Sequence, residues 1–229
     1  MRNDSSKNRE HALAVFLFLA LLPLLLVATS GCKSSSDEEA NNTPAVDSSD
    51  VYTLELLKDR LVKDKDLLSN PSTPIKASDM GTFRGLAYYP PDKRFALPVV
   101  LQRLGTPEEI VMATSKDKPR LMLYIGDFRF TLQGKDCALR VYAPKDTSDG
   151  NYWFIPFTDL TTGGDSYEGG RYIDIEDTRS DSTFLDFNYA YNPYCAYNER
   201  YDCPIPPAEN TLPVAITAGE KRYPLGHAH

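Results

Sequence analysis

The residues best suited to chemistry lie between positions 169 and 188. A glycine pair, Gly169-Gly170, would let backbone approach a ligand closely, and Arg171 after it could grip a carboxylate through two hydrogen bonds. Asp174 and Asp186 are predicted on neighbouring strands, where two carboxylates could serve as acid and base in a glycosidase-like hydrolysis. The structural alternative is that Arg171 pairs with one of these aspartates while Asn188 satisfies backbone groups.

Tyrosines and asparagines alternate through the following loop, which continues to about position 203. Aromatic faces can stack on a sugar-like or other polar planar ligand, and amides both donate and accept hydrogen bonds. The alternative is that the rings only pack the loop onto a sheet. The predicted ligand-binding candidates are Arg171, Asp174, Asp186, Asn188, Asn192, Tyr194 and Asn198.

Cysteine spacing predicts one disulfide. Cys195 and Cys203 have seven residues between them, and in an oxidising compartment we expect them to be bonded. The rival interpretation is half of a metal site, but zinc sites usually space their cysteines by two to four residues and need further ligands. No metal is therefore predicted. Cys137 falls on the apolar side of an alternating strand and is expected to be a buried free thiol.

Histidine scarcity and charge exclude several classes of protein. His11 precedes Cys32 in a segment expected to be removed, and His227 and His229 lie in a polar tail, so serine or cysteine catalytic triads lack a base. No phosphate-loop motif accompanies the glycine pairs, and no cofactor is predicted. Removing the first 31 residues, whose net charge is +1, changes the formal charge from -7 to -8, which argues against nucleic acid as a partner.

The N-terminus predicts export and lipidation. Arg2, Lys7 and Arg9 precede a short apolar run, as in a secretory signal peptide covering residues 1–31. Small residues then lead to Gly31-Cys32, which resembles a bacterial lipobox, with acyl chains such as palmitate expected on Cys32. Residues 32–50 are the lipidated cysteine and a polar segment expected to be a disordered tether. We therefore expect an anchored lipoprotein of the bacterial cell envelope, facing the periplasm or the cell exterior, with the membrane as a partner.

The elements that must position these residues are predicted as one helix and many strands. An amphipathic helix is expected over residues 51–68, with Leu54, Leu57, Leu61 and Leu68 on its apolar face. From Met80 the apolar period changes to two, which is typical of strands. The fold class is therefore mainly β: an antiparallel sandwich or a partly open barrel with one N-terminal amphipathic helix. Residues 51–224 are expected to form one domain, and residues 225–229 a frayed tail.

Proline and glycine give finer predictions within the strands. Pro98 should place its strand at a sheet edge or at a bulge. A tight turn is expected at Gly126-Asp127, and a hairpin loop over residues 133–136. Further strands are predicted over residues 152–157, 171–176, 183–189 and 212–218.

Several segments resemble one uncharacterised family. The resemblance begins at residues 81–86 and continues through the aromatic strand 153–157 and residues 170–172. It is most specific at Leu185-Asp186-Phe187-Asn188 and over residues 190–197, and it extends through residues 203–207 to Asn210 and Leu212. These segments are similar to the bacterial and archaeal domain-of-unknown-function family DUF 1684. The resemblance implies a single family domain after the tether and assigns no catalytic residue.

Three classes of function remain open on the sequence alone. The first is a lipid-anchored module that binds a small or glycan-like ligand. The second is a hydrolase that uses Asp174 and Asp186 as its carboxylates. The third is a non-enzymatic structural or assembly protein of the envelope, which would require a sizeable exposed apolar patch.

Overall fold

The structure is a computed structural model that describes residues 50–146 and 150–225. The predicted signal peptide, the lipidation site Cys32 and the tether up to residue 49 lie outside the described residues, as do residues 226–229. The first described residue, Asp50, is the N-cap of the helix that follows. Its carboxylate accepts hydrogen bonds from the amide of Tyr52 and the hydroxyl of Thr53, so it caps α1 (Val51–Ser69).

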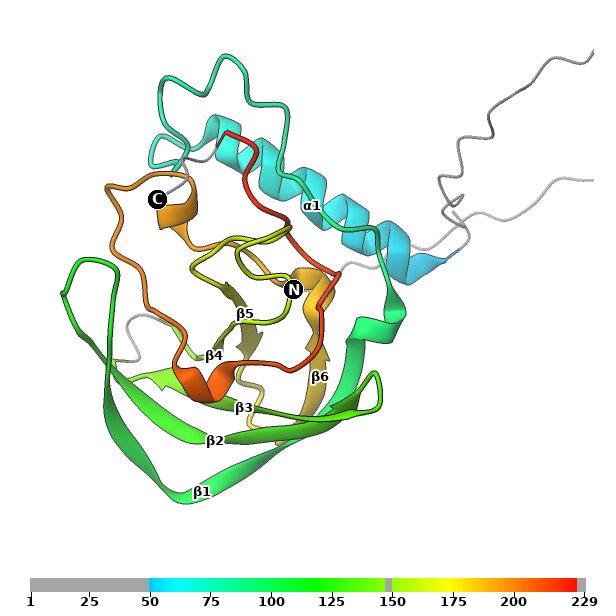
Figure 1. The fold of residues 1–229 in the computed structure, drawn as a ribbon, viewed down its shortest axis with the longest axis vertical. Helices are drawn as coiled ribbons and strands as arrows, with labels where there is room; N and C mark the ends of the chain where they lie inside the picture. The colour runs from blue at the N-terminus through cyan, green and yellow to red at the C-terminus, as the bar shows by residue number, and fades with distance from the viewer. Residues whose placement is uncertain (1–49, 147–149, 226–229) are drawn as a thin grey trace, which may run out of the picture. The chain divides into compact units, whose positions relative to one another are not determined.

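Six antiparallel strands form one sheet, in the order β5-β4-β3-β2-β1-β6. Their bounds are β1 Ala96–Met112, β2 Arg120–Leu132, β3 Lys135–Pro144, β4 Tyr152–Phe157, β5 Arg171–Glu176 and β6 Ser182–Asp186. The chain beyond β6 meets the opposite edge of the sheet, because Tyr191 forms an antiparallel bridge with Tyr172 of β5. The sheet is thus a nearly closed, barrel-like layer, which confirms the prediction of a partly open barrel (Figure 1).

Two long hairpins form the most regular part of this sheet. The predicted turn at Gly126-Asp127 is wrong: β2 runs straight through, and Gly126 lies beside irregularities in its pairing with both β1 and β3. The actual β2–β3 turn is only Gln133-Gly134, shorter than the predicted loop, with φ values of 51° and 74°. Positive φ at both central residues is what a two-residue hairpin turn requires.

Pro98 does not mark an edge strand. β1 lies between β2 and β6, so it has a neighbour on each side. At Pro98, however, the pairing is with β6 only, because the register with β2 begins at Leu101. Proline is tolerated there because its missing amide proton removes no bond from a strand pair that has not yet begun.

The core lies inside the curved sheet. Alternate residues of the strands point inward, and a segment near the C-terminus fills the remaining space. This segment was predicted as a strand over residues 212–218, but it forms no strand of the sheet and is largely irregular. Its side chains nevertheless belong to the core, which includes Phe128, Leu139, Val141, Trp153, Ile155, Phe157, Ile173, Leu185, Phe187, Leu212, Val214 and Ile216. Cys137 is buried in the same cluster, as predicted.

The helix α1 is present but its buried face differs from the predicted one. Leu56, Arg60 and Leu67 are buried against the domain, whereas Leu54, Leu61 and Leu68 are exposed. Figure 1 shows α1 on the side of the domain away from β1 and β2. In the part of the chain that the structure describes, no helix combines the length and hydropathy needed to cross a bilayer.

Candidate functional site

Arg171, the first residue of β5, is an internal clamp and does not face a ligand. Its side chain is fully buried and donates to the carboxylate of Asp159 at 2.9 Å. It also donates to the carbonyls of Ile216, Ala218 and Glu220, at 2.8, 2.5 and 3.0 Å. The predicted partners, Asp174 and Asp186, are not among these contacts. Arg171 therefore ties the irregular C-terminal segment to the sheet.

The local chain geometry explains why the arginine points inward. Gly170 before it has φ +82°, and a Cβ there would lie 2.6 Å from the carbonyl oxygen of Phe157. Only glycine allows the chain to enter β5 this close to the end of β4. Asp159, two residues after β4, also accepts from the amides of Thr161 and Ile216. Sequence reasoning missed Asp159 because nothing near it in the chain indicates its partner.

Asp186 and Asn188 are likewise structural. Asp186 ends β6, where its carboxylate accepts from the backbone amide and the side-chain amide of Asn188, both at 2.9 Å, and starts the 3-10 turn η3 (Phe187–Tyr189). Its other oxygen accepts from the hydroxyl of Tyr52 on α1 at 2.7 Å. Asn188 also bonds both backbone groups of Asp92. The predicted strand over residues 183–189 stops early because this carboxylate supplies the cap of the turn.

The paired-carboxylate prediction is wrong in its geometry. Asp174 lies on β5 and Asp186 on β6, which are the first and last strands of the sheet order and not neighbours. Each carboxylate has its own tyrosine partner, Tyr191 for Asp174 and Tyr52 for Asp186. No described contact joins the two carboxylates in one acid and base site.

Asn192 contacts the buried carboxylate of Glu220, a residue that was not singled out in the sequence. Its amide donates to Glu220 at 2.9 Å, and its side chain donates to the carbonyl of Lys221. Glu220 is 1% exposed and also accepts from the hydroxyl of Tyr197 and from Lys63 on α1, at 2.5 and 2.6 Å. Because Glu220 is surrounded by donors, its charge holds α1, the tyrosine-rich loop and the C-terminal segment together.

Two of the remaining loop candidates have different environments. Asn198 accepts a hydrogen bond from the amide of Arg200, so it shapes a turn. Tyr194 is half exposed, and its ring lies edge-on to Tyr201 with 5.3 Å between centroids. Tyr194 therefore remains available to a ligand.

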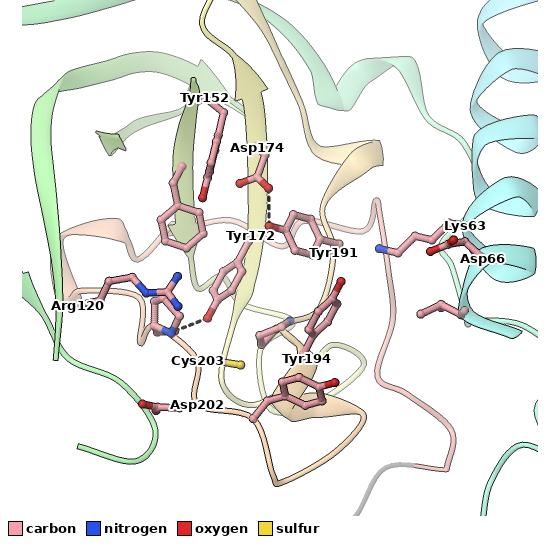
Figure 2. A pocket seen from close by; sticks show the side chains of 15 residues that line it. Lys63, Asp66, Arg120, Tyr152, Tyr172, Asp174, Tyr191, Tyr194, Asp202 and Cys203 are labelled. Atoms are coloured by element: carbon pink, nitrogen blue, oxygen red, sulfur yellow. Dashed lines mark hydrogen bonds between the residues drawn. The ribbon is translucent and has the colours of Figure 1, made fainter. Parts of the chain in front are cut away.

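A cavity of about 500 Å³ lies beside Tyr194, and it is the candidate site (Figure 2). It is bounded by the outer face of β4 and β5, by the loop after Tyr191 and by the C-terminal half of α1. Aromatic rings dominate the wall, with charged groups from four segments between them. The lining residues are Lys63, Asp66, Leu67, Arg120, Tyr152, Phe154, Tyr172, Asp174, Tyr191, Pro193, Tyr194, Tyr201, Asp202, Cys203 and Pro204.

Strand alternation determines which side chains reach this cavity. Tyr152 and Phe154 of β4, and Tyr172 and Asp174 of β5, occupy alternate positions and line it. The residues between them, such as Trp153 and Ile173, point into the core instead. Of the predicted ligand candidates only Asp174 and Tyr194 line the cavity. The period of two could have added Tyr172 to Asp174, but no sequence signal pointed to Lys63 or Arg120.

Asp174 is the most chemically suggestive group in the cavity. Its carboxylate is reached by solvent through the cavity, and it accepts a hydrogen bond of 2.7 Å from the hydroxyl of Tyr191. Surrounding protein atoms raise the pKa of this carboxyl group above its ordinary value, while Tyr191 and Lys63 act in the opposite direction. The ammonium of Lys63 lies 4.9 Å from the centroid of the Tyr191 ring. Figure 2 shows Lys63 and Asp66 projecting from α1 across the cavity from Asp174.

The two loop cysteines lie in contact at one side of the cavity. The amide of Cys195 donates to the sulfur of Cys203 at 3.2 Å. Both are free thiols in this structure, so the predicted disulfide is not present in it. A hydrogen bond from Cys203 lowers the pKa of the Cys195 thiol to about 7, and the same contact raises the pKa of Cys203.

The groups that line the cavity include stacking surfaces, hydrogen-bond acceptors and donors. Aromatic faces offer stacking surfaces, Asp174 offers an acceptor, and Lys63 and Arg120 offer donors. Among residues 50–146 and 150–225, no group of three or more histidine, cysteine or acidic side chains is arranged to hold a metal ion.

Comparisons with known proteins place the chain in a family without an assigned activity. A family model described as a protein of unknown function, DUF1684, matches residues 81–221. The solution NMR structure of an uncharacterised protein of Haloarcula marismortui is 35% identical, with a TM-score of 0.60, and the match covers 74% of this chain and 94% of that chain. No curated protein matches. The chain therefore belongs to the DUF1684 family.

Proposed function

We propose that this protein is a lipid-anchored binding module of the bacterial cell envelope, whose cavity takes a small, polar, ring-bearing ligand of sugar-like type. The observation that carries the ligand proposal is the aromatic cavity of about 500 Å³ that also contains Asp174. This volume is in the range of small-molecule sites, which combine apolar walls with a few oriented polar groups. The anchor proposal is supported by the sequence around Gly31-Cys32.

Sugar-like chemistry fits this wall better than a flat apolar ligand does. The apolar faces of a sugar ring stack on tyrosine, as Tyr194 and Tyr201 at the cavity edge would permit. Ring hydroxyls can donate to Asp174 and accept from Lys63 or Arg120. The presence of both charge signs disfavours a strongly charged ligand of either sign.

We also propose that Cys195 and Cys203 form a disulfide in the oxidising envelope, with the closed loop bordering the cavity. Support comes from their contact and from the lowered pKa of Cys195, which supplies the attacking thiolate. Bond formation transfers two electrons and two protons to a disulfide-bearing acceptor of the compartment, which is thereby reduced to two thiols.

A thermal-shift screen of the full-length chain in detergent micelles tests the ligand proposal. Panels of neutral sugars, amino sugars and amino acids are compared. A ligand present at about 100 times its Kd should stabilise the fold by about 2.7 kcal/mol. Tyr194→Ala should then weaken binding roughly three- to tenfold, as expected for one lost stacking contact.

Tyr189→Ala is the matched control, because Tyr189 is similarly exposed, at 44% against 50% for Tyr194, but does not line the cavity. Its affinity should stay at the wild-type value. An equal loss in both variants, or no sugar that raises the unfolding temperature, would refute the sugar-binding proposal.

A further inference from the structure

The exposed face of α1 carries an unusual concentration of apolar side chains. Thirteen large hydrophobic residues are exposed within the described part of the chain, and five of them lie on this one helix. They are Val51, Leu54, Leu61, Val62 and Leu68. Side chains that pack no core and recur along one element indicate a surface that meets something else.

Their spacing produces a continuous stripe. Leu54, Leu61 and Leu68 are seven residues apart, so they lie on the same side of α1 at intervals of about 10 Å. The opposite side packs on the domain through Leu56 and Leu67. The helix thus has two apolar faces, and only one of them is used within the fold.

Two exposed lysines, Lys58 and Lys65, interrupt the stripe. By helical geometry each lies within about 60° of the leucine row. Among the acidic residues of α1, Glu55, Asp59 and Asp66 lie further round the helix, toward one flank. Asp64 lies on the other flank, where it is half-buried and accepts a hydrogen bond from the amide of Leu86. Leucines interleaved with lysines are typical of helices that lie in a bilayer interface, because lysine stems can cross the apolar layer while their ammonium groups reach lipid phosphates.

The position of α1 along the chain indicates the occupant. Only 18 residues separate Cys32 from Val51, and even fully extended they span no more than about 65 Å. Among the elements of the fold, α1 follows directly on this segment and has the shortest tether to the predicted lipid. A second copy of the chain fits the stripe less well, because parallel or antiparallel pairing of α1 would place Lys58 and Lys65 opposite lysines.

We propose that the exposed face of α1 docks on the surface of the membrane that holds the lipid of Cys32. Leu54, Leu61 and Leu68 enter the interfacial layer, and Lys58 and Lys65 contact anionic phosphate groups. This inference rests on the lipid anchor of the proposed function. Docking would hold the domain in one orientation on the membrane. The helix α1 would then lie between the bilayer and the cavity, to whose wall it contributes Lys63 and Asp66.

Depth-dependent fluorescence quenching tests this orientation. The full-length, lipidated Leu61→Trp variant is reconstituted in vesicles of phosphatidylethanolamine and phosphatidylglycerol with brominated acyl chains. The native Trp153 is 1% exposed and supplies a constant background. The emission added by position 61 should fall about twofold or more relative to unbrominated vesicles, since interfacial helices bury their apolar face about 5–10 Å deep.

The matched control is Val111→Trp, at an equally exposed apolar position of β1 (66% against 61% for Leu61). Its emission should be unaffected by brominated lipid. Equal quenching at both positions, or none at either, would overturn the docking proposal. Protection of position 61 from aqueous iodide without quenching by brominated lipid would overturn it in favour of a second copy.

Vesicle flotation separates the failure of docking from the failure of anchoring. Wild type that does not float with the vesicles contradicts the lipid anchor on which the inference rests. If wild type and Leu61→Trp both float while the added tryptophan stays unquenched, docking alone is contradicted. Lys58→Gln combined with Lys65→Gln should float normally and show reduced quenching of the added tryptophan.

Discussion

At the scale of single residues, the polar groups that looked catalytic mostly hold the fold together. Arg171 was predicted to lie beside Asp174 or Asp186, yet its guanidinium is buried with Asp159 and three carbonyl groups. The structural alternative for Asn188 is confirmed, since it bonds both backbone groups of Asp92. The protein itself must supply all the partners of a buried charge. Residues that hold the fold together are therefore of the same charged and polar types as those of a binding site, and the sequence does not distinguish them.

Replacing Arg171 by alanine should therefore strongly lower the free energy of unfolding. The change leaves the buried carboxylate of Asp159 without its cation, and we expect a loss of about 3–5 kcal/mol in the free energy of unfolding. Chemical denaturation measures this loss. Arg129→Ala is the control, because Arg129 pairs with Asp127 at the surface and should cost less than about 1 kcal/mol. Similar losses for both variants would contradict the clamp role.

The cysteines give a second prediction at this scale. Full-length protein alkylated at harvest should contain a peptide with Cys195 joined to Cys203, worth roughly 2.5 kcal/mol of stability in the chain-entropy model. After reduction, alkylation of Cys195 should accelerate as the pH rises through about 7, since its thiol ionises there. Cys137 is the internal control: burial raises its pKa, so it should react slowly. Free thiols at both loop cysteines at harvest would contradict the disulfide.

At the scale of elements, α1 shows how a helix can be predicted correctly and oriented wrongly. The leucines of α1 occur on two sides, and the buried side also carries Arg60. Arg60 is acceptable there because it donates to the carbonyls of Tyr89 and Asn188. An analysis of hydrophobic periodicity treats arginine as polar and therefore excludes the side of α1 that carries Arg60. The row of leucines on the other side was predicted to face the core instead.

A matched pair of substitutions distinguishes the two faces of α1. Leu56→Ala should destabilise the fold by about 2–5 kcal/mol, because Leu56 is fully buried and its removal leaves a cavity. Leu61→Ala should change stability by less than about 0.5 kcal/mol, because Leu61 is 61% exposed. Both exchange leucine for alanine in one helix, so the difference in unfolding midpoint reports packing alone. A larger loss of stability for Leu61→Ala than for Leu56→Ala would support the buried face that was predicted from the sequence.

At the scale of the whole molecule, the prediction concerns attachment of the domain to the membrane. Cys32→Ser should abolish partition of the full-length chain into membranes, because the acyl chains expected on Cys32 supply the anchor. Detergent-phase extraction of wild type and variant measures the effect. Ser30→Ala is the control, because it retains the Gly31-Cys32 junction and the small residues before it. A Cys32→Ser chain that stays in the detergent phase would contradict lipid anchoring.

Sequence by itself determined the class of fold, because local patterns carry that information. The change from helical to period-two spacing near Met80 separates α1 from the strands, and turn residues such as Gln133-Gly134 join strands adjacent in the chain. Burial of Cys137 followed from the same alternation. The resemblance at residues 185–197 agrees with the family match over residues 81–221.

Tertiary structure alone decided which polar groups meet. Asp159 reaches Arg171, and Glu220 reaches Lys63 over 157 residues, because closure of the sheet and the irregular C-terminal segment bring distant positions together. The strand order places Asp174 and Asp186 on opposite edge strands, and closure sets Asp174 beside Tyr191 in the cavity. Contacts between residues far apart in the chain leave no periodic trace in it, so the site could only be located once the sheet had closed.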